Sequence, residues 1–145
     1  MTNTPTITDT ISVEKEVLDK IVEFPLGIPG FTEAHRFVFS QESGEKPFSW
    51  MRSLDVPEIA FAVVEAYYLV PDFSFEVDDR ELEVIESPSP VDCAVFFLAK
   101  IELGEKLRIW TNCHAPILIN TRARKGRQVT LPWEPGVEEP TLFEF

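Results

Sequence analysis

The chain has 145 residues, 44% of them hydrophobic, and carries a formal net charge of −12. This length and composition predict a single domain with its own core, and the excess of acidic side chains argues against direct nucleic-acid binding, which depends on clustered Lys and Arg. The longest fully apolar run, CAVFFLA at 93–99, is too short to cross a bilayer, and MTNTPTITDT lacks the features of a signal peptide. We therefore expect a cytoplasmic protein that does not contact a membrane.

Proline and aromatic content indicate a mainly β fold. Twelve prolines are scattered along the chain and leave few windows long enough for an ordinary helix. Twelve phenylalanines, together with many Val and Ile residues, suit half-buried strands. We predict a small antiparallel β-barrel-like domain with one short helix. Its expected boundaries are a loose N-terminal segment at 1–12, the domain itself at 13–131, and an acidic, proline-containing C-terminal tail at 132–145.

The first element, VEKEVLDKIVEF at 13–24, is ambiguous because its apolar spacing fits either a helical face or a strand. We choose a strand from about Val17 onward, since the chain is otherwise rich in β-forming residues. The element must end at Pro25, which fixes φ and removes a backbone donor.

FPLGIPGF at 24–31 predicts a sharp structured turn. Pro29 and Gly30 fit the two central positions of a type II turn, so Phe24 and Phe31 can pack on one core from opposite sides of the corner. A phosphate-binding loop is the alternative, but it would need a following helix and a nearby lysine, and neither is evident. The residues assigned to the structural turn are Pro25, Gly27, Pro29 and Gly30.

Periodic or continuous apolar residues predict the elements that follow. A hairpin is expected from strands at 35–40 and 48–54, and IAFAVVEAYYLV at 59–70 is apolar enough to form a central strand, after which DFSFEV alternates. DDRELEVIE at 78–86 is the helix candidate, because Asp78 can cap it and Glu81 has capping-box spacing. Further strands are expected at 91–103, 106–112, 116–120 and 127–131, with RARKG as the turn between the last two.

The sequence contains no recognisable catalytic or metal-binding motif. His35 and His114 lack partners at the spacing of a metal site or a triad, so both are expected at the surface or in loops. Cys93 and Cys113 lie far apart in apolar runs and are predicted to be buried thiols. We expect no cofactor, no metal and no enzymatic activity.

An enzyme or ligand-binding domain is the alternative hypothesis for a barrel of this size. Its pocket would be lined by Trp50, Tyr67 or Tyr68. A closed, ligand-sized cavity with convergent polar groups would favour this alternative, whereas a barrel filled by side chains would not.

Two blocks of charge stand out. From Asp72 to Glu86 there are seven acids and one base, Arg80, and this segment is either a solvated face or a surface for a basic partner. TRARKGRQ at 121–128 concentrates basic residues around a glycine, which favours a hairpin tip over an RNA site. The candidate partner-binding residues are Asp72, Phe73, Phe75, Glu76, Asp78 and Asp79.

Three segments in this order resemble the FliW family of flagellar assembly factors. They are FPLGIPGF, then PFSWMRSLD at 47–55 with IAFAVVEAYYLVPDFSFEV behind it, and then TNCHAPILINTRARKGRQVTL at 111–131. The resemblance covers about Ile11 to Leu131. Met51-Arg52 and Cys113-His114 depart from the residues common at those places in the family. The resemblance implies nothing about the tail at 132–145.

The resemblance implies a small β-barrel-like protein that is not an enzyme. Members of the family bind CsrA, a dimeric RNA-binding repressor of translation, and relieve its repression of flagellin mRNA. They also bind flagellin, so that accumulated flagellin occupies the protein and frees CsrA. An acidic chain is suited to approach a basic RNA-binding protein quickly.

Overall fold

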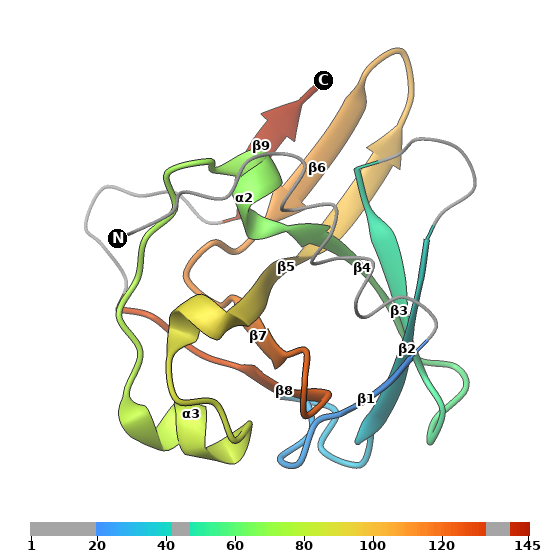
Figure 1. Cartoon of the computed structure of the whole chain (residues 1–145). Coiled ribbons are helices and arrows are strands. Elements are labelled where there is room, and N and C mark those ends of the chain that lie inside the picture. The colour runs from blue at the N-terminus through green and yellow to red at the C-terminus, as the bar shows by residue number, and fades with distance from the viewer. Residues whose placement is uncertain (1–19, 42–46, 133–139) are drawn as a thin grey trace.

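The computed structural model describes residues 20–41, 47–132 and 140–145, and within them it contains nine strands and three short helices (Figure 1). The strands are β1 (Ile21–Glu23), β2 (Arg36–Gln41), β3 (Ser49–Ser53), β4 (Ala60–Glu65), β5 (Cys93–Leu103), β6 (Leu107–Thr111), β7 (Ile117–Asn120), β8 (Lys125–Gln128) and β9 (Thr141–Glu144). The helices are α2 (Ala66–Leu69), α3 (Asp79–Val84) and the 3₁₀ turn η1 (Pro90–Asp92). In this part of the chain no helix has the length and apolar character needed to span a membrane.

The strands form a ring, which confirms the prediction of a mainly β, barrel-like domain. They follow the order β4-β3-β2-β1-β8-β7-β5-β6-β9, and an additional pairing of β4 with β5 closes a ring of seven. Strands β6 and β9 continue the sheet outside the ring, beyond the C-terminal half of β5 (Figure 1). Neighbouring strands are antiparallel throughout, except that β1 meets β8 in parallel at Glu23 and Lys125.

Strand β5 has buried side chains on both faces, as its continuous apolar sequence requires. Ala94 and Phe96 belong to the cluster inside the ring, and Val95 and Phe97 belong to a second cluster on the outer face. The neighbouring strands β4 and β7 alternate in the same way. The inner cluster, which we call the inner core, consists of Val22, Phe24, Ile28, Ala34, Phe37, Phe39, Met51, Val63, Ala94, Phe96, Ile117 and Ile119.

The second cluster, the outer core, is covered by the chain between β4 and β5. Helices α2 and α3 contribute Leu69 and Leu82 to it, and the irregular segment between the helices adds Phe73, Phe75 and Val77 at its margin. In Figure 1 this segment descends along the left side of the molecule from α2 to α3. Burying one face of the covering chain leaves its other face in water.

Three predictions about this covering chain were wrong in detail. The strand expected at 59–70 ends at Glu65, and Ala66 and Leu69, one helical turn apart, are buried together by α2. DFSFEV does alternate between core and solvent, but no strand in the described residues pairs with it, so it stays irregular. The single predicted helix is found as α3, accompanied by α2 and η1.

Other expectations were met in part. Strand β1 begins at Ile21, and Lys20, which was expected to belong to it, lies in a bend. Residues 17–19 of the expected range, like the loose segment at 1–12, lie outside the described residues. Strand β8 begins at Lys125, so the turn before it is at 121–124 and not at RARKG. Residues Thr141–Glu144, which we assigned to the tail, form β9 and pair with β6.

Cys93 and Cys113 are half-buried, not fully buried, and neither forms a disulfide.

FPLGIPGF forms the predicted structural turn. The amide of Phe31 donates to the Ile28 carbonyl at 2.7 Å, and Gly30 has a φ of +87°, as the third position of a type II turn requires. Gly27 also has a positive φ, of +70°. The turn lets Phe24 contact Phe37 edge to face at 5.2 Å within the inner core, while Phe31 contacts Phe61 at 5.4 Å.

We predict that Gly27→Ala destabilises the fold more than Gly30→Ala. Both substitutions place a side chain at positive φ, which costs about 1 kcal/mol or more. A Cβ at Gly30 would have open space, whereas a Cβ at Gly27 would lie 2.8 Å from the Cα of Thr32. Urea unfolding of the two variants measures the difference, and equal losses of stability would contradict the assigned close contact.

Candidate functional site

The acidic segment, defined as residues 72–86, is mounted on the outer core. Its backbone is irregular as far as Asp78 and then forms α3. The candidate residues Asp72, Glu76, Asp78 and Asp79 are all exposed. Of the predicted set, these four carboxylates are therefore the side chains that face water.

The two aromatic candidates lie in a different environment from the acids. The ring of Phe73 contacts Phe97 of β5 edge to face at 5.1 Å, and Phe75 lies 5.2 Å from Phe73. Both side chains are half-buried against the outer core. Their main effect is thus to hold the acidic segment on the sheet, and only part of each ring is available to a partner.

Helix α3 begins as the sequence predicts, with one difference. Asp78 is the N-cap, and its Oδ1 accepts a hydrogen bond from the Arg80 amide at 2.9 Å. Glu81 was expected to complete a capping box. Its carboxylate accepts instead from the Arg127 guanidinium, with Nε to Oε2 at 2.7 Å.

The acidic and basic blocks of the sequence meet at this point. Arg127 pairs with Glu81, and the Lys125 ammonium lies 2.6 Å from Glu86 and 3.6 Å from Glu23. The hydrogen bond and the negative charge of Glu86 raise the pKa of Lys125. Two of the four basic side chains in TRARKGRQ are therefore engaged in fixing α3 to β8, which weakens the alternative of an RNA site there.

Asn120, the last residue of the APILIN motif, fastens the C-terminal end of α3. Its Nδ2 donates to the carbonyls of Ile85 and Glu86 at 2.9 and 3.1 Å. Its Oδ1 accepts from the amides of Arg122 and Ala123, which closes the turn before β8. The side chain is 7% exposed, so one buried amide serves both segments. No role for Asn120 was predicted from the sequence.

The surface that remains after these contacts is negative. Among the described residues, Asp72, Glu76, Asp79 and Glu83 form no ion pair, and Asp78 has only the exposed Arg80 at 3.7 Å. Exposed carboxylates on a fixed backbone create a local negative potential that attracts basic surfaces.

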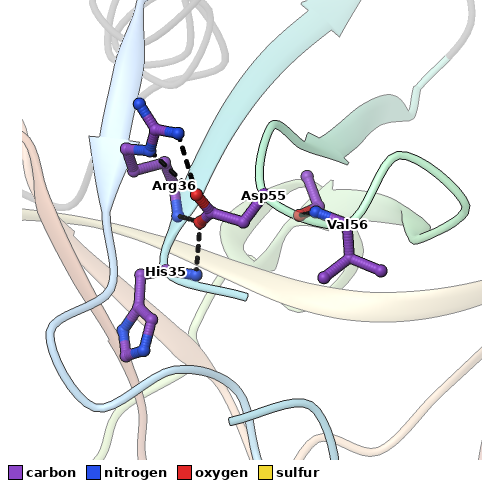
Figure 2. Close-up of polar contacts among 5 residues, drawn as sticks. His35, Arg36, Asp55 and Val56 are labelled. Atoms are coloured by element: carbon purple, nitrogen blue, oxygen red, sulfur yellow. Dashed lines mark hydrogen bonds and ion pairs between the residues drawn. The ribbon is translucent and has the colours of Figure 1, made fainter. Parts of the chain in front are cut away.

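A second polar cluster lies beside the FPLGIPGF turn (Figure 2). The carboxylate of Asp55 faces the start of β2 and accepts from the amides of His35 and Arg36 at 2.8 and 2.7 Å, and from the Arg36 side chain at 2.9 Å. These backbone hydrogen bonds, ahead of the charge of Arg36, lower the pKa of Asp55 below its ordinary value of 3.8. Asp55 thus joins the β3–β4 connection to the start of β2, and its role is structural.

Two further residues that were considered for catalysis or metal binding, His35 and Cys93, make structural contacts. The Nδ1 atom of His35 lies 3.0 Å from the Phe24 carbonyl, and in the tautomer that carries a proton there it donates to that oxygen. The Cys93 thiol donates to the Ser87 hydroxyl at 3.4 Å, and burial raises the pKa of this thiol. Within the described residues, no three His, Cys, Asp or Glu side chains lie close enough to hold a metal ion.

The three residues of the alternative ligand pocket contact other aromatic rings. Trp50 packs edge-on against Phe48 at 6.2 Å, Tyr67 contacts Phe73 at 6.4 Å, and Tyr68 contacts Phe145 at 5.7 Å. Side chains packed in this way fill the space beside one another, which does not favour a ligand pocket lined by these three residues.

The geometry defines a class of protein: a mainly β, barrel-like domain that holds an acidic surface segment on its outer face. The model of the FliW protein family matches residues 5–138. Flagellar assembly factor FliW of Treponema denticola is 35% identical over 113 residues, which cover 78% of this chain and 76% of the relative. The corresponding protein of Caldanaerobacter subterraneus subsp. tengcongensis is 36% identical over 115 residues, 78% and 75% of the two chains.

A solved structure agrees with these sequence matches. The crystal structure of a flagellar assembly factor FliW superposes with a TM-score of 0.70 at 30% identity, covering 85% of this chain and 83% of the other. The chain belongs to the FliW family, which confirms the resemblance identified from its motifs.

Asp55→Asn is predicted to destabilise the protein at neutral pH and to reduce its sensitivity to acid. Because the folded-state pKa is lowered, the stabilisation by Asp55 is fully present above the ordinary value of 3.8 and is lost as the pH falls below it. The difference in melting temperature between wild type and variant should therefore shrink in acid. A difference independent of pH would contradict the role of the charged carboxylate.

Asn120→Ala is predicted to loosen the acidic segment as well as lower stability. Two backbone amides and two carbonyls lose a buried partner, and leaving such groups unsatisfied costs about 1–3 kcal/mol each when they stay dry. Amide hydrogen exchange should accelerate in α3 and in the turn at 121–124. If hydrogen exchange accelerated uniformly over the whole chain, Asn120 would stabilise the fold as a whole and not α3 in particular.

Proposed function

We propose that this chain binds the RNA-binding repressor CsrA through its acidic segment and thereby relieves repression of flagellin mRNA translation. Membership of the FliW family supports the biological role. The observation that carries the choice of surface is the exposure of the four carboxylates Asp72, Glu76, Asp78 and Asp79 within one short segment. On this proposal the protein is a cytoplasmic regulator and not an enzyme.

Electrostatic attraction is the main physical contribution of this surface. A protein that binds RNA presents Lys and Arg side chains to solvent, and a local negative field accelerates its encounter with an acidic partner. Exposed charges at the rim of an interface act chiefly on the association rate and are screened by salt. We therefore assign the acids to steering and orientation.

The contacts that hold the acidic segment in place add to this electrostatic attraction. The pairs Arg127–Glu81 and Lys125–Glu86, and the hydrogen bonds of Asn120, hold α3 in place before any partner arrives. Binding to a segment that is already ordered avoids the entropy cost of ordering it. The exposed parts of Phe73 and Phe75 can then add apolar contact between the charges.

We further propose that flagellin binds the same protein and so controls how much of it is available to CsrA. A cytosol in which flagellin accumulates would occupy the protein, release CsrA and stop further flagellin synthesis. This arrangement requires only that binding of one partner lowers the affinity for the other, and by linkage the effect is reciprocal.

The double variant Asp72→Lys/Glu76→Lys tests the proposal without touching the Asp78 cap. We predict that its association with CsrA at low salt is slower by roughly tenfold, because steering commonly changes association rates by that order or more. Stability should be nearly unchanged, since both side chains are exposed and unpaired in the described structure. Stopped-flow measurement of association, with melting temperature alongside, provides the result.

The matched control is Glu33→Lys/Glu58→Lys, which changes the net charge by the same amount at exposed positions outside the acidic segment. It should slow association much less. If the control slowed association as strongly, only overall charge would matter, and if neither variant had an effect, the acidic segment would not be the CsrA surface.

A further inference from the structure

Strand β9 forms an open edge of the sheet. It pairs with β6 on one side, in the register Arg108↔Glu144 to Thr111↔Thr141, and no strand among the described residues pairs with its other side. Figure 1 shows β9 beside β6, at the outer end of the sheet and beyond the closed ring. An exposed edge of this kind can accept a further strand.

The hydrogen-bonding direction along β9 follows from one contact. The Phe145 amide donates to the Leu107 carbonyl at 2.9 Å, so Phe145 and Phe143 direct their backbone groups toward β6. In an antiparallel pair the intervening residues direct theirs away. The amides and carbonyls of Leu142 and Glu144 therefore point outward, ready for the next strand.

An apolar row lies on one face of this edge. We define it as Leu103, Leu107 and Phe145, which are neighbours across β5, β6 and the end of β9. Leu103 is 65% exposed and Phe145 is 52% exposed. The ring of Tyr68 on α2, 40% exposed, lies 5.7 Å from Phe145 and borders the row. The row thus offers exposed apolar surface next to backbone groups that no strand in the described part of the chain pairs with.

Natural edge strands are protected by short length, by charged side chains, especially Lys, by Pro or by a bulge. Strand β9 is short and carries the charged Glu144, but it lacks the other protective features. The four residues of β9, TLFE, include neither Lys nor Pro, and their register with β6 has no bulge. The edge is therefore chemically competent to pair.

We propose that the outer edge of β9 binds an extended segment of another protein as an additional strand, with apolar and basic side chains in alternation. The apolar side chains would continue the row beyond Phe145, and the basic ones would lie on the opposite face with Glu144, which is exposed and has Arg108 3.5 Å from its carboxylate. A second copy of this chain fits less well, because each copy carries a net charge of −12 and would repel the other.

The probe for this proposal is a short capped peptide of alternating Val and Lys, labelled for fluorescence anisotropy. A peptide of the same sequence, N-methylated at every second residue, is the matched control, since it keeps the charge but cannot form the hydrogen bonds along one edge. The full chain should bind the first peptide and bind the second at least about tenfold more weakly, a ratio that loss of a few net hydrogen bonds can produce. On binding, the amides of Leu142 and Glu144 should become protected from hydrogen exchange.

Substitution in the chain provides a second comparison. Leu142→Pro removes an outward-facing donor and places a ring against the incoming strand, a position where an edge strand tolerates proline. Leu142→Ala keeps the donor. The proline variant should lose the peptide and the alanine variant should retain it, while the amides of Phe143 and Phe145 stay protected in both.

Equal binding of the two peptides by the wild-type chain, or no binding of either, would overturn the proposal. Equal affinity of the proline and alanine variants would overturn it as well, because binding would then depend on charge alone. If the proline variant released β9 from β6, the two peptides would still decide the matter, since that comparison uses the unaltered chain.

Discussion

Strand β5 must bury both of its faces, and the rest of the structure depends on this constraint. Its side chains alternate between the inner core, through Ala94 and Phe96, and the outer core, through Val95 and Phe97. Burial of a large apolar side chain contributes about 1.5–3 kcal/mol, so neither face can be left in water without a large loss of stability. The ring of strands satisfies one face, and the chain from α2 to α3 has to satisfy the other.

The acidic segment is a consequence of that second requirement. Phe73, Phe75 and Val77 pack on the outer core, and the intervening residues are forced toward solvent, where acidic side chains are tolerated. The ion pairs of Arg127 and Lys125 then fix α3 against β8. A packing requirement in the core thus explains why a negative surface stands at a defined place and in a defined conformation.

Sequence reasoning predicted those features that depend on local chemistry. The apolar run at 91–103 predicted the strand found as β5, the prolines and glycines of FPLGIPGF predicted the turn, and Asp78 predicted the cap of α3. It could not distinguish strand from helix at 66–69, because a short apolar run fits both periods. It also could not match Arg127 with Glu81, since the two are 46 residues apart and only the fold brings them together.

Two of the errors had a signal in the sequence. TLFE in the tail contains the β-forming residues Thr141 and Phe143, and assigning 132–145 to a tail overlooked β9. Gly126 was interpreted as a turn glycine, but it lies within β8, where the Phe24 ring leaves no room for a Cβ, with Cζ only 2.6 Å from where one would be. A glycine in a strand can mark such a close approach instead of a turn.

The central claim is that the acidic segment is the surface that meets CsrA. Amide hydrogen exchange of the full chain, with and without saturating CsrA, tests it most directly, because it reports every part of the surface in one experiment. The account predicts that new protection is concentrated between Asp72 and Val84. Protection confined to the FPLGIPGF turn or to the basic turn at 121–124, with residues 72–84 unchanged, would contradict it.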